Sequence, residues 1–214
     1  MNKEESSYQL LDSGDGKKIE RFGPVSLVRP AAGAVWEPEH RRLWKNADAE
    51  FSREREGWRW ERNGRLPEQW EATHHQLRFI LKRTDFGHVG LFPEHAAIWD
   101  WVRSRIAERP AIQVLNLFAY SGGATLAAAA AGAQVCHVDA SKGMVEWARE
   151  NAALNGLEQH PIRWIVDDVF KFLAREARRG RRYDGIILDP PSFGRGKRGE
   201  VFKVEEDLIP LLDL

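Results

Sequence analysis

The stretch Gly185-Ile186-Ile187-Leu188-Asp189-Pro190-Pro191-Ser192-Phe193 decides how the second half of the chain is interpreted. Its first four residues form a short apolar run that is typical of a buried strand, and Asp189 places a carboxylate where that strand ends. Upstream, the apolar run at residues 114–118 passes into Ala119-Tyr120-Ser121-Gly122-Gly123, a glycine turn before a helix. Ligands of open α/β sheets bind at the carboxyl ends of the strands, so the two stretches predict parts of one site.

Strands and helices alternate regularly beyond about residue 109. The pattern predicts strands at residues 113–118, 134–138, 163–166 and 184–188. Helices are expected at residues 124–131, from a Ser141 cap to about residue 155, and at residues 169–178, each followed by a glycine. Such alternation requires right-handed crossovers, so the fold class is α/β, with a doubly wound parallel sheet that has helices on both faces.

Residues 1–84 have a different texture and are expected to form a small β-containing module before the domain at residues 85–214. Short strands are expected at residues 8–11, 18–22 and 25–29, and the Gly23-Pro24 pair predicts a hairpin turn between the last two. The interval from residue 37 to residue 70 mixes Trp with Arg and Glu. We expect its tryptophans to fill the core of the module, and the alternative is that they stack on bases. The tryptophans in question are Trp36, directly before this interval, and Trp44, Trp58, Trp60 and Trp70 within it.

Composition excludes several classes of protein. The 32 Lys and Arg residues equal the 32 Asp and Glu residues, and neither half has an excess, which argues against an arm that binds polyanions. The single cysteine, Cys136, excludes an internal disulfide framework and fits a reducing compartment. No apolar leader or run of about 18 apolar residues occurs, so we expect a cytoplasmic protein with no membrane partner. His74 and His75 are expected to point apart on a strand, and no metal is expected.

The loops after the strands indicate a small nucleotide-like ligand. The turn at residues 120–123 lacks the Gly-x-Gly-x-x-Gly spacing, which disfavours a dinucleotide. Asp139 ends the second strand, where a carboxylate can accept both hydroxyls of a ribose or can simply cap the strand. Asp168 follows the third strand and can accept from an adenine amino group, or can cap the helix that begins at Val169.

Together these loops resemble those of class I methyltransferases that use S-adenosylmethionine. The motifs Asn116-Leu117-Phe118-Ala119-Tyr120-Ser121-Gly122, Val138-Asp139-Ala140-Ser141, Asp167-Asp168-Val169-Phe170 and Asp189-Pro190-Pro191-Ser192-Phe193 resemble the bacterial large-subunit (23S) ribosomal RNA methyltransferase family. Gly90-Leu91-Phe92-Pro93-Glu94-His95 resembles a family element that approaches the cofactor. The resemblance covers residues 87–194 and implies an S-adenosylmethionine site. Its implied cofactor residues are Phe92, Phe118, Tyr120, Ser121, Gly122, Gly123, Asp139, Ala140, Ser141, Asp168, Val169 and Asp189.

The Asp-Pro-Pro loop is expected to position the methyl acceptor. Pro190 and Pro191 fix φ and remove two donors, which leaves a stiff loop whose carbonyls and Asp189 carboxylate all accept hydrogen bonds. The resemblance implies that Phe193 stacks on the target, although Ser192 separates it from the prolines. The alternative is a rigid surface turn. Cys136 lies inside a strand and is expected to be structural, so it is no candidate for the cysteine that methylation at a pyrimidine C5 requires.

The resulting hypothesis is a methyltransferase that acts on a base in RNA, with ribosomal RNA favoured. Alternatives are transfer to a protein or a small molecule, and an inactive fragment that only binds RNA. That fragment would use the basic runs at residues 175–182 and 195–198, both expected near the acceptor edge of the sheet. Family sheets have seven strands and only four are visible, with residues 205–214 starting another helix. We therefore expect a chain that lacks strands five to seven, with its fourth strand at an aggregation-prone edge.

Overall fold

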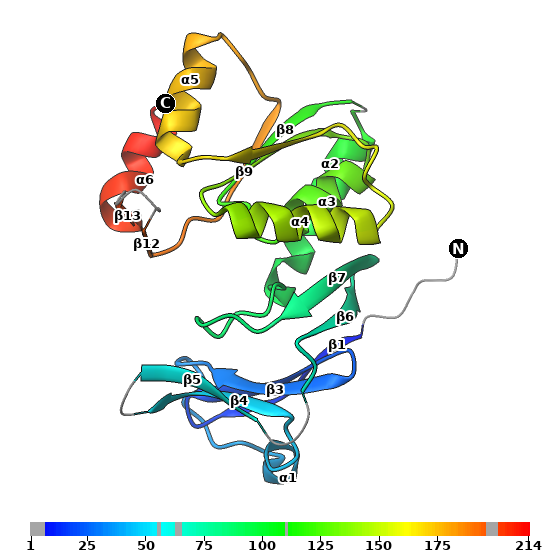
Figure 1. The fold of residues 1–214 in the computed structure, drawn as a ribbon, viewed down its shortest axis with the longest axis vertical. Coiled ribbons are helices and arrows are strands. Elements are labelled where there is room, and N and C mark those ends of the chain that lie inside the picture. The colour runs from blue at the N-terminus through cyan, green and yellow to red at the C-terminus, as the bar shows by residue number, and fades with distance from the viewer. Residues whose placement is uncertain (1–6, 55–56, 63–65, 110, 196–200) are drawn as a thin grey trace. The chain divides into compact units, whose positions relative to one another are not determined.

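The computed structural model describes residues 7–54, 57–62, 66–109, 111–195 and 201–214. The chain forms two compact units, Met1–Pro93 and Glu94–Leu214, so the boundary lies nine residues beyond the expected residue 84. Figure 1 shows the elements of both units. No helix in the described part of the chain is long and apolar enough to cross a bilayer.

The N-terminal unit consists mainly of β-strands. Its elements are β1 (Tyr8–Gly14), β2 (Lys17–Phe22), β3 (Val25–Pro30), α1 (Arg41–Trp44), β4 (Ala49–Glu54), β5 (Gly57–Arg62), β6 (Gln69–His74) and β7 (Leu77–Lys82). Strands β1 to β5 form one sheet in chain order, in which only β3 and β4 run parallel, and β6 and β7 form a separate hairpin. The predicted turn at Gly23-Pro24 is confirmed, because β2 and β3 pair antiparallel across it.

The tryptophans of this unit fill its core only in part. Trp70 is buried, and its Nε1 donates to the Phe22 carbonyl over 3.1 Å. Trp36 and Trp58 are exposed, so the core-filling interpretation is wrong for both. Trp58 instead stacks on Phe51 of the neighbouring strand, with ring centroids 5.3 Å apart. Residues 55 and 56 of the Arg/Glu/Trp stretch lie outside the described residues.

The expectation that His74 and His75 point apart is also wrong. His75 lies in the β6–β7 turn with a φ of +45°, which breaks the alternation of a strand, and the two imidazole centroids are 4.7 Å apart. His74 is buried, and its Nε2 lies 3.1 Å from the Pro93 carbonyl oxygen. Within the described ranges, no group of three or more His, Cys, Asp or Glu residues could hold a metal ion.

The C-terminal unit alternates strands and helices as the sequence predicts. Its elements are η1 (Pro93–His95), α2 (Ala96–Ala107), β8 (Gln113–Leu117), α3 (Gly123–Ala130), β9 (Gln134–Asp139), α4 (Lys142–Leu154), β10 (Ile162–Val166), α5 (Val169–Arg178), β11 (Gly185–Leu188), β12 (Phe193–Arg195), β13 (Val201–Lys203) and α6 (Val204–Leu212). Helix α2 was not among the expected elements. β12 and β13 form a small antiparallel pair.

The four main strands form a parallel sheet in the order β10-β9-β8-β11. Helices α3 and α4 pack against β8, β9 and β10, and α5 and α6 contribute Phe172 and Leu211 to a core built on the other face. Leu115, Leu117 and Cys136 point into that second core, so the prediction of a buried Cys136 is confirmed. Figure 1 shows α5 separated from α3 and α4 by the sheet.

Strand β11 pairs with β8 on one side and has no second partner among the described strands. Ile186 in the middle of β11 is exposed. The chain order reverses between β8 and β11, because β9 and β10 follow on one side of β8 and β11 lies on the other. This arrangement creates a topological switch point. The expectation of missing strands stays a prediction.

Candidate active site

The register of the sheet brings the predicted loops to one edge. Leu117 of β8 pairs with Leu188 of β11 and with Val138 of β9, so Phe118, Asp189 and Asp139 follow three aligned positions. These residues therefore meet at the carboxyl ends of neighbouring strands. Asp189 and Phe118 lie on the two sides of the switch point, where open α/β sheets bind their ligands.

The turn after β8 has an unusual backbone. Phe118, Tyr120 and Gly122 all have positive φ angles, +51°, +49° and +94°. Left-handed backbone is uncommon for residues other than glycine and costs on the order of 1 kcal/mol for each. Contacts hold the turn in place, since the Phe118 ring packs on Phe202 at 4.9 Å and the Tyr120 ring lies 5.8 Å from Trp147. Strain of this kind is concentrated at functional sites.

Asp139 joins the turn after β8 to the turn after β9. Its Oδ2 accepts from the Tyr120 backbone N–H over 2.9 Å, and its Oδ1 accepts from the Ser141 backbone N–H over 2.8 Å. Burial raises the pKa of the Asp139 carboxyl, and these two hydrogen bonds act in the opposite direction without cancelling that effect. Each oxygen accepts one bond and retains capacity for another, so hydroxyl donors of a ribose would supply what this desolvated carboxylate lacks.

Gly122 and Gly123 are required by packing between protein elements. A Cβ on Gly122 would lie 3.0 Å from the Ala148 Cβ of α4, and a Cβ on Gly123 would lie 2.6 Å from Cζ2 of Trp99 on α2. The expectation from the sequence is that these glycines leave room for a ligand. In the structure, the missing side chains let two helices approach the turn.

Asn151 is a further buried residue that contacts this turn, and the sequence did not predict its role. It lies on the inner face of α4, and its Nδ2 donates to the Ser121 carbonyl over 2.9 Å. The sequence did contain a signal for Asn151, which shares the apolar face of its helix with Val145, Ala148 and Ala152. A buried amide on such a face needs a hydrogen-bond partner.

The residues predicted after β9 and β10 have structural roles. Ser141 is the N-cap of α4, although its side chain makes no capping hydrogen bond, and Ala140 beside it is exposed. Asp168 caps α5, with Oδ1 accepting from the Lys171 N–H over 3.1 Å. Val169 is buried in the core under α5. The proposed contacts of these residues with a cofactor stay predictions.

The Asp-Pro-Pro loop is open to solvent and is anchored by a histidine. The Asp189 side chain is 69% exposed, and its Oδ2 lies 3.3 Å from His95 Nε2 at the start of α2. Phe193 begins β12 and is also exposed. His95 belonged to a stretch that resembled a cofactor element, but nothing in the sequence paired it with Asp189. Phe92 lies in the N-terminal unit, 5.0 Å from the His88 ring, and its proposed role stays a prediction.

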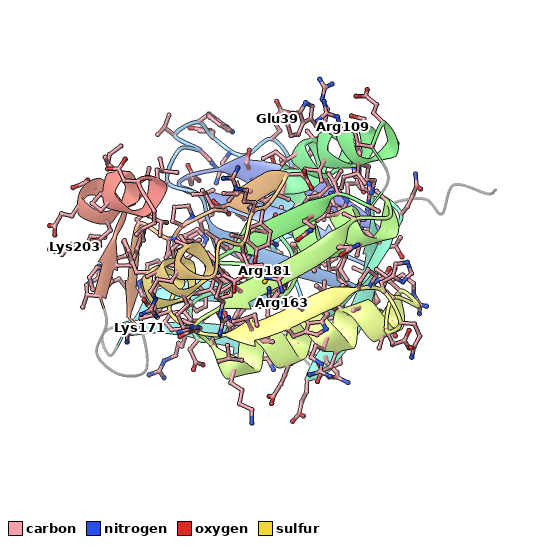
Figure 2. All side chains as sticks on the ribbon, turned by 90° about the horizontal axis from the view of Figure 1, so that it is seen from above. Glu39, Arg109, Arg163, Lys171, Arg181 and Lys203 are labelled. Atoms are coloured by element: carbon pink, nitrogen blue, oxygen red, sulfur yellow. The ribbon has the colours of Figure 1, made fainter. Side chains whose placement is uncertain are left out.

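Only the start of the basic run at residues 175–182 lies near the carboxyl edge of the sheet, where Arg175 pairs with Asp167 after β10, and the end of the run is not near this site, contrary to expectation. Arg181 and Arg182 precede the amino end of β11, whereas Asp189 follows its carboxyl end. The four residues of β11 alone span about 13 Å. Figure 2 shows the side chains and labels Arg163 of β10 and Arg181, which lies between α5 and β11. Of the second run, Lys197 and Arg198 lie outside the described residues.

Comparisons with known proteins agree with this geometry. The model of the S-adenosylmethionine-dependent methyltransferase family matches residues 51–207. The solved S-adenosylmethionine-dependent methyltransferase from Agrobacterium tumefaciens is 47% identical, with a TM-score of 0.91 over 97% of this chain and 67% of that chain. SMU.776, solved in complex with SAH, is 24% identical with a TM-score of 0.79 over 97% of this chain and 57% of that chain, a likeness of fold.

Two curated relatives carry the name of a ribosomal RNA enzyme. Ribosomal RNA large subunit methyltransferase K from Neisseria meningitidis is 28% identical over 94% of this chain and 59% of its own length. Ribosomal RNA large subunit methyltransferase K/L from Pseudoalteromonas atlantica is 38% identical over 66% of this chain and 20% of its own length. The chain therefore spans only part of these relatives. The strained turn, the bridging carboxylate and the family match over residues 51–207 agree, and the chain belongs to the S-adenosylmethionine-dependent methyltransferases.

Proposed function

We propose that this methyltransferase acts on a base in RNA, with large-subunit ribosomal RNA as the substrate. The observation that carries the proposal is the exposed Asp189 loop at the switch point of a chain whose curated relatives are named ribosomal RNA methyltransferases. A carboxylate that is 69% exposed is open to an acceptor carried on a large polymer. The neighbouring exposed Phe193 offers an aromatic face on which a base can stack.

The proposed roles follow the strand ends. Asp139 receives the ribose hydroxyls, Asp168 receives the adenine amino group, and the turn at residues 118–123 surrounds the methionine part of the cofactor. When bound, S-adenosylmethionine supplies an electrophilic methyl group. Asp189 accepts a hydrogen bond from the acceptor base and holds it in line for transfer, while Pro190 and Pro191 keep the loop stiff.

The test is methyl incorporation from labelled S-adenosylmethionine into large-subunit ribosomal RNA that lacks modifications. Wild-type protein should label this RNA, and Asp189→Ala should lower the rate by about a hundredfold while the cofactor Kd stays within about twofold. Asp184→Ala is the matched control, because Asp184 is an exposed carboxylate just before the opposite end of β11. It should leave transfer nearly unchanged.

Salt dependence separates an RNA substrate from the alternatives. Binding of RNA should weaken steeply between about 50 and 200 mM salt because phosphate contacts release counterions, whereas a neutral metabolite should bind with little dependence. Labelling of a protein or a metabolite in a cell extract, with none in RNA, would refute the RNA proposal and leave the cofactor chemistry standing. RNA binding without any transfer would favour the binding-only alternative.

A further inference from the structure

Helix α2 contacts both parts of the candidate site, the turn after β8 and the Asp189 loop after β11. At its start, His95 Nε2 lies 3.3 Å from Asp189 Oδ2. One turn later, the Trp99 ring occupies the space that a Cβ on Gly123 would need. Residues four apart lie on the same face of a helix. One face of α2 therefore reaches both the turn and the loop.

The contact with His95 uses one of the two carboxylate oxygens of Asp189. The other oxygen, Oδ1, has no hydrogen-bond partner among the residues that the structure describes. A carboxylate held through one oxygen presents its second oxygen in a restricted direction. Because the Asp189 side chain is 69% exposed and the His95 side chain 30% exposed, the pair adds little to folding stability. The contact would instead serve to orient the Asp189 carboxylate.

We propose that His95 is a positioning residue for methyl transfer, which holds the Asp189 carboxylate so that Oδ1 accepts a hydrogen bond from the acceptor base. The inference rests on the proposed function, because it takes the Asp189 loop as the place where that base binds. It assigns α2 the role of setting the acceptor loop against the turn at residues 118–123. Errors of about 1 Å in such an alignment cost up to about a hundredfold in rate.

His95 can be substituted without removing a helix cap. It is the N-cap residue of α2, but its side chain makes no capping hydrogen bond. His95→Gln keeps a polar side chain of similar length and loses the ring that reaches Asp189. The matched control is His160→Gln, since His160 is an exposed histidine just before β10, at the amino edge of the sheet.

The decisive measurement is a double-mutant cycle on single-turnover methyl transfer to RNA, with His95→Gln, Asp189→Asn and the pair combined. His95→Gln alone should slow transfer about tenfold with an unchanged cofactor Kd, and in the Asp189→Asn background it should cost less than about twofold. His160→Gln should transfer at the wild-type rate. Equal losses from His95→Gln in both backgrounds, or no loss in either, would overturn the inference.

A second measurement needs no substrate and separates this inference from the proposed function. The imidazole ¹⁵N resonances of His95 should move in Asp189→Asn and stay in place in Asp184→Asn, because Asp184 lies at the other end of β11 and accepts from the Gln113 N–H over 2.7 Å. A wild-type protein that is inactive on RNA would refute the proposed function. If the protein is inactive on RNA and the His95 resonances also stay in place in Asp189→Asn, the His95–Asp189 contact is overturned as well. If the His95 resonances move in Asp189→Asn, the contact stands although the proposed function does not.

Discussion

Lowering the pH from 7 to 5 should destabilise this protein through one buried histidine. His137 on β9 is fully buried and its Nδ1 lies 2.9 Å from Thr125 Oγ1, whereas its Nε2 has no hydrogen-bond partner among the described residues. Thr125 Oγ1 also accepts from Asn116 Nδ2 over 2.9 Å, so the ring is held by a short polar chain inside an apolar layer. Burial lowers the pKa of His137 from 6.5 to about 3.

The sign and size of the effect follow from that shift. A histidine with a depressed folded-state pKa stabilises the fold above its unfolded pKa of 6.5 and loses that contribution as the pH falls toward 3. At pH 5 the His137 ring is still neutral in the folded protein, so the change in unfolding free energy depends only on protonation of His137 in the unfolded chain. Between pH 7 and pH 5 the unfolding free energy falls by about 2 kcal/mol.

Urea denaturation at pH 7 and pH 5 measures this loss for wild type and for His137→Asn. The variant removes the titrating ring, so its pH dependence should be smaller than that of wild type by about 2 kcal/mol, whatever its stability at pH 7. All other histidines are common to both proteins and cancel. His160→Asn, which removes an exposed histidine, should keep the wild-type slope. An undiminished slope in His137→Asn would refute the reasoning.

Three further outcomes are expected. Asp139→Ala should weaken binding of S-adenosylmethionine about tenfold or more in calorimetry, because it removes a carboxylate acceptor for ribose hydroxyls; an unchanged Kd would remove Asp139 from the site. Gly123→Ala should lower the unfolding free energy by about 1–3 kcal/mol, because its Cβ would lie 2.6 Å from Trp99. Gly143→Ala is the control and should not destabilise the protein, because the one atom near its Cβ belongs to Ser141 and lies 3.9 Å away. Burial raises the pKa of Glu176, but hydrogen bonds from Tyr183 and Arg163 outweigh burial and lower the pKa from 4.5 to about 2. Glu176→Gln should therefore lower the unfolding free energy by on the order of 2 kcal/mol at pH 7. The difference in stability between wild type and variant should narrow as the pH falls from 4.5 to 2, because the wild-type carboxylate becomes protonated. Thermal melts of both proteins across that pH range would measure this difference in stability, and a difference that stays constant would contradict the reasoning.

The sheet of the C-terminal unit could be predicted because three of its strands are short, mainly apolar runs that end at an aspartate, and the fourth, β8, passes into a glycine turn. The helix at Val169–Arg178 was predicted to the residue, since Asp168 before it and Gly180 after it mark both ends. Parallel strands then bring their carboxyl ends together without further information. Asp139 and Asp189 were therefore placed at one edge from sequence alone.

Helix α2 and strands β4 to β7 were missed for different reasons. Helix α2 buries Trp99, Val102 and Ile106 but exposes Ile98 and Trp101, so apolar residues lie on both faces and the helical period is blurred. Strands β6 and β7 alternate cleanly between buried and exposed positions. The alternation of apolar and polar residues in β6 and β7 is a strand signal. It was not used, because the region was treated as one irregular stretch on account of its Trp and Arg content.

The site itself shows where a local pattern stops being informative. The glycine turn was predicted in the right place, but the packing role of its glycines could not be predicted, since what a missing Cβ would meet depends on helices α2 and α4, which are remote in the chain. The same holds for His95, whose partner Asp189 lies 94 residues away. Both cases involve α2, whose residues beyond His95 belong to none of the motifs found in the sequence. The turn itself is braced within the protein by Trp99, Asn151 and Asp139. Substitution of His95 should affect transfer more than cofactor affinity, because His95 contacts the Asp189 loop whereas other residues hold the turn, and this is the split that the His95 experiment measures.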